Sequence, residues 1–70
     1  MPLIQVTMVQ GRTTEQKHAL IRSLSASMAE ALDVPLERIR VAIYEVTADE
    51  WGIGGEAFSA VRPSPTPPAP

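Results

Sequence analysis

The fold is decided by residues 3–46, which read LIQVTMVQGRTTEQKHALIRSLSASMAEALDVPLERIRVAIYEV. Hydrophobic side chains alternate from Leu3 to Val9 and again from Ile39 to Val46, as they do in strands with two unequal faces. Between these two stretches, apolar residues recur at three- and four-residue spacings, which is typical of an amphipathic helix. So short a strand, helix and strand sequence predicts an α/β fold, a βαβ unit whose two strands are parallel.

Local signals set the ends of the predicted helix. Thr13 and Gln16 have the spacing of a capping box, so we expect the helix to begin near Thr14. The Asp-Val-Pro sequence at 33–35 is expected to end it. The residues expected to form its buried stripe are Leu20, Ile21, Leu24, Met28, Ala31 and Leu32.

Two further segments follow the second strand. Residues 51–55, Trp-Gly-Ile-Gly-Gly, have the glycine density of a short hairpin, because only glycine adopts a positive φ without steric cost. Five of the seven prolines lie in the last eight residues, a composition that can neither pair in a sheet nor fill a core. We therefore predict one domain over residues 1–62 and a disordered proline-rich tail over residues 63–70.

The chain is short for a stable single domain. A chain of this size buries only about 60% of the surface that its unfolded form exposes. It has no cysteine for disulfides, and one imidazole, that of His18, does not make a metal site. Two strands and one helix also leave sheet edges open. We therefore expect a homo-oligomer in which the sheet continues into a neighbouring subunit.

Charge and hydropathy restrict the partners. The net charge is −2 and the isoelectric point is about 5.2, so the chain lacks the basic surface that nucleic acids and anionic membranes select. No stretch approaches the roughly 20 apolar residues of a membrane span, and the first residues do not resemble a signal peptide. The sequence therefore predicts a soluble cytoplasmic protein with neither nucleic acid nor membrane as a partner.

Pro2 is the first candidate for chemistry. Removal of Met1 before this small residue leaves a secondary amine at the start of the chain. An ordinary α-amino group has a pKa of about 7.7 to 8.0, and an apolar pocket beside arginines lowers it, since both effects penalise the protonated form. Such an amine is a general base at neutral pH. Taken alone, however, Pro2 is also a common second residue.

Three arginines and a tryptophan are further candidates. Arg12 follows the first strand and Arg40 interrupts the apolar pattern of the second, and arginine binds carboxylates through two parallel hydrogen bonds. Arg12 can equally stabilise its turn, Arg40 can form a subunit salt bridge, and Arg38 can serve the site or remain solvated. Trp51 can supply a dry wall to a pocket or simply pack between subunits.

Taken in order, these residues resemble the 4-oxalocrotonate tautomerase family over nearly the whole chain, from Pro2 to about Arg62. The shared motifs are the strand that opens with Pro2, the Gly11-Arg12 turn followed by Thr-Thr-Glu-Gln-Lys, the Arg40-Val41 strand and the hairpin at 51–56. Trp51 stands where the best-known members carry phenylalanine, and Arg38 has no evident counterpart.

The resemblance implies a hexamer, a trimer of dimers, and a cofactor-independent isomerase. It implies that Pro2 is the general acid and base and that Arg12 and Arg40 bind and polarise a substrate carboxylate from neighbouring subunits. The expected substrate is a 2-hydroxydienoate or a related unsaturated oxo acid, with Trp51 lining the pocket. No metal or cofactor is needed, because the amine and two cations supply the base and the electron sink.

Two other functions stay open at this point. Related members hydrate or dehalogenate small acids or decarboxylate a semialdehyde, using extra acidic or aromatic residues. Inspection assigns no such role to Tyr44, Glu45 or Glu56. The other alternative is an oligomeric binding module that keeps the fold without the chemistry.

Overall fold

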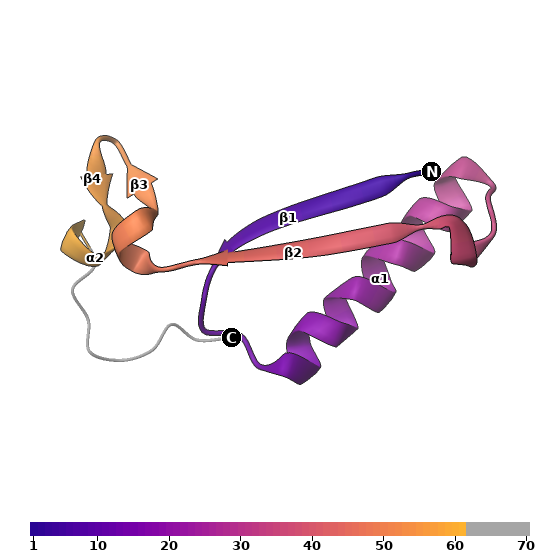
Figure 1. Cartoon of the computed structure of the whole chain (residues 1–70), viewed down its shortest axis with the longest axis horizontal. Helices are drawn as coiled ribbons and strands as arrows, with labels where there is room; N and C mark the ends of the chain where they lie inside the picture. The colour runs from indigo at the N-terminus through magenta and orange to yellow at the C-terminus, as the bar shows by residue number, and fades with distance from the viewer. Residues whose placement is uncertain (62–70) are drawn as a thin grey trace.

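The computed structural model describes residues 1–61 and has the predicted βαβ order (Figure 1). The main elements are β1 (Leu3–Val9), α1 (Thr14–Leu32) and β2 (Arg40–Val46). The short ones are the 3₁₀ helices η1 (Leu36–Arg38) and η2 (Ala48–Glu50), the strands β3 (Gly52–Ile53) and β4 (Glu56–Ala57), and α2 (Phe58–Val61). The predicted tail at 63–70 lies outside the described residues.

β1 and β2 form a parallel pair in which Leu3 lies opposite Arg40 and Val9 opposite Val46. Hydrogen bonds continue past both ends of the pair. The Arg40 N–H donates to the Pro2 carbonyl at 3.0 Å, and the Gln10 N–H donates to the Val46 carbonyl at 2.8 Å. The first of these bonds fixes Pro2 at one end of the sheet.

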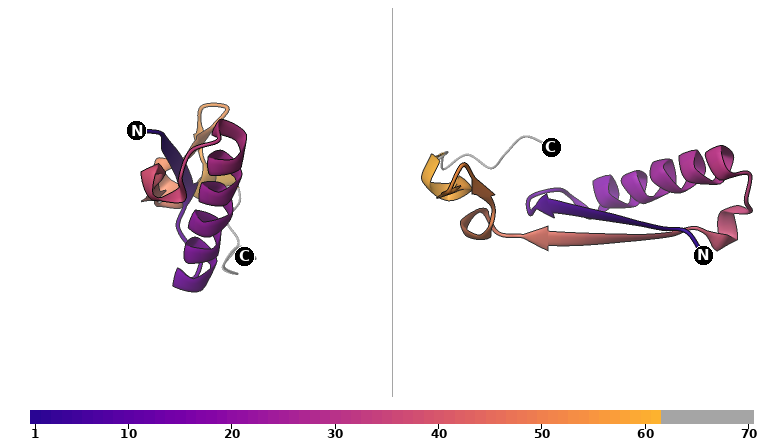
Figure 2. Two further views of the ribbon diagram at one scale, coloured as in Figure 1. Left: turned by 90° about the vertical axis from the view of Figure 1, so that its right-hand side faces the viewer. Right: turned by 90° about the horizontal axis from the view of Figure 1, so that it is seen from above.

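α1 covers only one face of this sheet, and the other face is open (Figure 2). Side chains alternate across a strand, so Ile4 and Val6, with their partners Val41 and Ile43, share the face that α1 covers. The opposite face carries polar and apolar side chains, among them Leu3 at 53% exposed and Tyr44 at 51% exposed.

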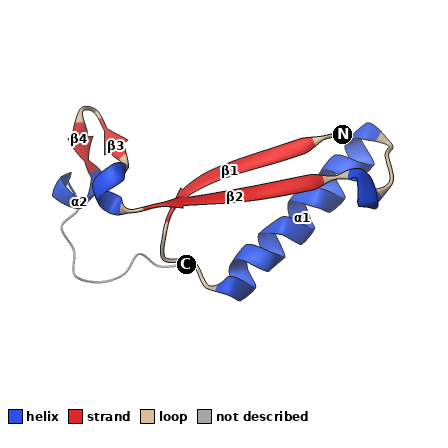
Figure 3. Cartoon of the chain, in the orientation of Figure 1, coloured by secondary structure: helices blue, strands red, loops and turns tan. Residues whose placement is uncertain are grey.

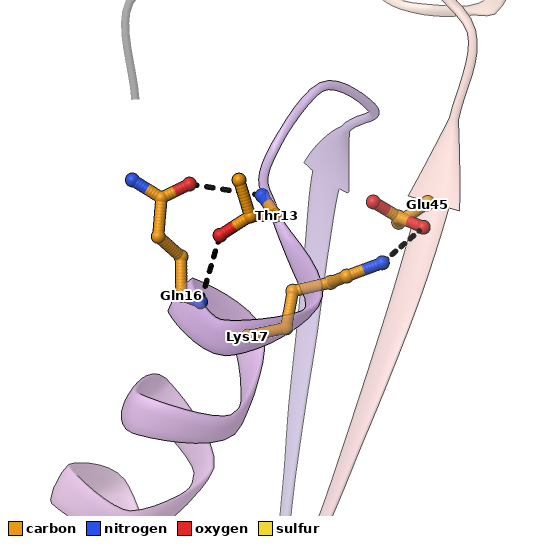
Figure 4. A network of polar contacts seen from close by, with 4 residues as sticks. All are labelled: Thr13, Gln16, Lys17 and Glu45. Atoms are coloured by element: carbon orange, nitrogen blue, oxygen red, sulfur yellow. Dashed lines mark hydrogen bonds and ion pairs between the residues drawn. The ribbon is translucent and has the colours of Figure 1, made fainter.

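The start of α1 is held by the predicted capping box (Figure 4). The Gln16 N–H donates to Thr13 Oγ1 at 3.0 Å, and the Thr13 N–H donates to Gln16 Oε1 at 2.9 Å. One residue further on, Lys17 Nζ lies 3.0 Å from Glu45 Oε1. This ion pair ties the first turn of the helix to the end of β2.

Removing the cap is expected to weaken the fold measurably. Thr13→Ala deletes the oxygen that accepts the Gln16 N–H, and such a loss costs about 1 kcal/mol of stability per chain. Unfolding in denaturant at a fixed protein concentration measures the difference. Thr14→Ala is the matched control, because Thr14 is the first helical residue and its substitution leaves the cap intact. Equal losses in both variants would contradict the assigned role of Thr13.

α1 ends at Leu32 and is capped by Asp33, where the Asp-Val-Pro sequence was predicted to end it. Asp33 adopts the left-handed conformation (φ 55°, ψ 51°), its N–H donates to the Glu30 carbonyl, and the Val34 N–H donates to the Ala29 carbonyl. This is the Schellman pattern that satisfies the last carbonyls of a helix.

The predicted buried stripe is wrong at its last turn. Leu20, Ile21, Leu24 and Met28 are half-buried, but Ala31 and Leu32 are exposed. The reason is length, since the 19 residues of α1 extend about 28 Å and the seven of a strand about 23 Å. The last turn of the helix therefore overhangs the sheet.

The residues after β2 form an arm that points away from the sheet (Figure 3). Gly54 and Gly55 join β3 to β4, both with positive φ (60° and 89°), as the glycine pattern predicted. The arm is closed by the Phe58 N–H, which donates to the Trp51 carbonyl at 2.7 Å. Sequence analysis did not predict α2 or the two 3₁₀ helices.

One chain does not build a core. Among residues 1–61 the only buried hydrophobic side chain is that of Ile39, at 7% exposed. The radius of gyration of the Cα atoms is 15.1 Å, whereas a compact domain of this length has about 11 Å. The apolar surface left open on the sheet and arm requires cover from other chains.

Candidate active site

Pro2 and Arg40 lie together at one end of the sheet. The Pro2 carbonyl accepts the Arg40 N–H at 3.0 Å, so the main chains of the two residues are adjacent. Arg40 pairs with Leu3 on the open face, while alternation continued from β1 puts Pro2 on the side of Ile4, which α1 covers. The two side chains of one chain therefore start from opposite faces of the sheet.

Pro2 itself is half-buried, and the residue before it is not. Met1 is 85% exposed and precedes the first strand. The ladder bond to Arg40 holds Pro2 through its carbonyl, so removal of Met1 leaves this anchor in place. The proline ring would then present its nitrogen from a fixed position at the end of β1.

The Arg40 guanidinium is held by the turn that precedes β2. Its Nη1 atom donates to the Glu37 carbonyl at 2.6 Å and to the Ile39 carbonyl at 3.1 Å. Guanidinium has five N–H groups, so, as far as residues 1–61 are concerned, the Nε and Nη2 groups remain for a ligand. Two donors on one edge are what bidentate binding of a carboxylate requires.

This anchoring by η1 was missed by sequence analysis. Arg40 donates to the backbone carbonyl of Glu37. Every residue has a backbone carbonyl, so the type of residue 37 does not predict this bond. The available signal was Pro35, which cannot continue α1 and starts the tight turn that exposes these carbonyls.

Arg12 and Trp51 lie beyond the other end of the sheet. Arg12 follows β1 and Trp51 follows η2, so each is a full strand away from the Pro2 end (Figure 1). At about 3.3 Å per residue, a seven-residue strand separates them from Pro2 by more than about 20 Å. A single chain therefore does not bring the four predicted site residues together.

Most of the other polar side chains considered have partners within the chain. The Gln5 side-chain amide donates to Tyr44 Oη at 3.3 Å across the open face, and Glu45 pairs with Lys17. His18 is exposed on α1. Within residues 1–61, no three side chains of histidine, cysteine, aspartate or glutamate gather as metal ligands, and no helix is long and apolar enough to cross a membrane.

The family model for tautomerase enzymes matches residues 2–61. The chain belongs to the tautomerase family. A 2-hydroxymuconate tautomerase of Pseudomonas sp. strain CF600 is 53% identical over 62 residues, which cover 89% of this tautomerase and 98% of that relative. The predictions of a tautomerase, and hence of an isomerase, are confirmed.

Solved structures agree with the fold of this tautomerase. A heterohexamer 4-oxalocrotonate tautomerase from Chloroflexus aurantiacus J-10-fl is 47% identical with a TM-score of 0.84, covering 89% of this chain and 100% of that one. TomN, a 4-oxalocrotonate tautomerase homologue in the tomaymycin biosynthetic pathway, is 37% identical with a TM-score of 0.87, covering 93% and 100%. The predicted βαβ subunit with a short hairpin is confirmed.

Proposed function

We propose that this chain catalyses the keto–enol isomerisation of a 2-hydroxydienoate, with the amine of Pro2 as the general acid and base. The observation that carries the proposal is the place of Pro2 at the start of β1, where its carbonyl accepts the Arg40 N–H and its nitrogen becomes the chain terminus once Met1 is removed. The 53% identity to a 2-hydroxymuconate tautomerase supports this substrate class.

The reaction moves one proton. In the chain that starts at Pro2, the nitrogen lone pair takes the proton from the 2-hydroxyl group of the dienol. The resulting ammonium returns a proton to a carbon further along the conjugated chain, giving the α,β-unsaturated ketone. No atom or electron is gained or lost overall, so the amine is regenerated at each turnover.

The arginines supply the electrostatic part of the mechanism. Arg40 binds the carboxylate and hydroxyl end of the substrate with its Nε and Nη2 donors and draws electron density along the conjugated system. Arg12 holds a second carboxylate where the substrate has one. Trp51 excludes water from the pocket, and a dry pocket favours the neutral amine.

The site is completed between chains. Pro2 and Arg12 of one chain lie more than about 20 Å apart along β1, so one substrate can meet both only when they come from different chains. A head-to-tail arrangement of neighbouring sheets brings the Pro2 end of one chain to the Arg12 and Trp51 end of another. We infer a homohexamer, a trimer of dimers, in the same size class as the heterohexamer relative.

The direct test joins mass spectrometry to an ultraviolet assay. The intact mass of the purified protein is expected to be that of the chain without Met1, because an amide nitrogen at Pro2 has no basicity. The same material is expected to convert 2-hydroxymuconate, seen as the loss of dienol absorbance. A processed and folded protein that leaves the dienol unchanged would favour the binding-module alternative.

The rate should rise with pH. Burial and neighbouring cations both destabilise the protonated amine, so the pKa of Pro2 is expected below the ordinary range of about 7.7 to 8.0. The neutral form is the base, so kcat/KM should climb as pH rises through this pKa and then level off. Steady-state assays from acidic to mildly alkaline pH give kcat/KM as a function of pH. A flat profile across neutrality would contradict the assigned base.

A further inference from the structure

We propose that Arg38 is a specificity-determining residue, a cation beside the Pro2 end that attracts anionic substrates and favours dicarboxylates over monocarboxylates. The inference rests on the proposed function and extends it to a residue with no role in the mechanism above. Its basis is the placement of Arg38, the lack of a partner for its charge among residues 1–61 and the charge balance of its segment.

Placement comes from the chain path. Arg38 is the last residue of η1, and its N–H donates to the Pro35 carbonyl at 3.0 Å. Two residues later, the Arg40 N–H bonds the Pro2 carbonyl. Arg38 therefore lies two residues before β2, at the end of the sheet where Pro2 lies.

The charge of Arg38 is not neutralised by the fold. Its side chain is exposed and has no ion pair or hydrogen bond with any of residues 1–61. Lys17 differs, because Glu45 lies 3.0 Å from its Nζ atom. Arg40 differs as well, since two backbone carbonyls hold its Nη1 atom. An unpaired guanidinium keeps its full field for an approaching anion.

Arg38 also decides the sign of the local charge. The segment 36–40 holds Glu37, Arg38 and Arg40 and is therefore positive by one unit, within a chain whose net charge is −2. Without Arg38 the segment is neutral. A dianion approaching the Pro2 end would then meet a net negative protein with no local excess of positive charge.

Coulomb's law sets the size of the effect. Arg38 and Arg40 are two residues apart, about 7 Å along an extended chain. In water, one charge roughly 9 Å from a substrate charge changes affinity about two-fold. The expected loss without Arg38 is thus about four-fold for a dianion and two-fold for a monoanion. High salt removes it, because the Debye length falls to about 3 Å at 1 M.

The test compares Arg38→Gln with Arg22→Gln. Both variants lose one exposed arginine, but Arg22 lies in α1, away from the end of the sheet. We expect Arg38→Gln to lower kcat/KM for 2-hydroxymuconate about four-fold at low ionic strength, through KM, and for a dienol monocarboxylate about two-fold. Both losses should vanish near 1 M salt. Arg38→Lys should restore the wild-type values, and Arg22→Gln should match wild type throughout.

Equal losses for the two substrates, or losses that persist at high salt, would overturn the role of Arg38. So would an Arg22→Gln variant that behaves like Arg38→Gln, because the effect would then come from net charge alone. Pro2→Ala is run in parallel and separates the two hypotheses. A fully active Pro2→Ala enzyme contradicts the proposed function, whereas an inactive one beside an unchanged Arg38→Gln enzyme contradicts only the present inference.

Discussion

Replacing Pro2 with alanine is expected to lower kcat for 2-hydroxymuconate by at least about 100-fold, the usual contribution of a positioned general base. Alanine is also small, so Met1 is still removed and the variant starts with a free primary amine. It lacks the ring that fixes the nitrogen at the end of β1. The loss therefore measures the positioned secondary amine, and an ultraviolet assay with intact-mass control records it.

Pro67→Ala is the matched control, because it removes a proline outside the segment 2–61 that matches the family. It should keep wild-type kcat. Both variants should retain the wild-type oligomer size by light scattering and the wild-type unfolding midpoint, since the Pro2 carbonyl that accepts the Arg40 N–H survives the substitution. Wild-type activity in a correctly processed Pro2→Ala protein would remove Pro2 from the mechanism.

Arg40→Ala is expected to lower kcat by about 100- to 1,000-fold, the range seen when a group that stabilises transition-state charge is deleted. Arg40→Lys keeps the charge but loses the paired Nε and Nη2 donors, so it should recover only part of this loss. Steady-state assays of both variants separate charge from geometry. Equal activity of lysine and arginine at this position would show that bidentate binding is unimportant.

Mixing Pro2→Ala chains with Arg40→Ala chains tests whether the two residues of one site come from different chains. If Pro2 and Arg40 of one site come from different chains, random co-assembly of Pro2→Ala and Arg40→Ala chains regenerates about one intact site in four. Co-expression followed by assay should then recover about a quarter of wild-type activity. If both groups come from the same chain, the mixed oligomers stay inactive, and only Arg12 and Trp51 are then left to come from a neighbouring chain.

Much of the fold could be predicted because its signals are local. The alternation in Leu3–Val9, the Thr13 and Gln16 capping pair and the glycines at 54 and 55 each act within a few residues, and each takes the predicted conformation. The end of the buried stripe was wrong because burial of Ala31 and Leu32 depends on the relative lengths of helix and strand, which periodicity does not encode.

The candidate site was less accessible to sequence reasoning. Residue type identifies Pro2, Arg12, Arg40 and Trp51 as candidates, but only the parallel register shows that two of them lie at each end of the sheet. The orientation of Arg40 depends on backbone carbonyls, which every residue carries. In the proposed mechanism, partner chains complete the site. A single sequence does not show which surfaces of two chains come into contact.

The near absence of buried side chains in the isolated chain has a thermodynamic consequence. Since Ile39 is the only buried hydrophobic side chain within residues 1–61, folding and association become one equilibrium governed by mass action. The melting temperature of such a protein depends on the protein concentration, and dilution alone can unfold it. A stability quoted for this polypeptide has meaning only together with the concentration at which it was measured.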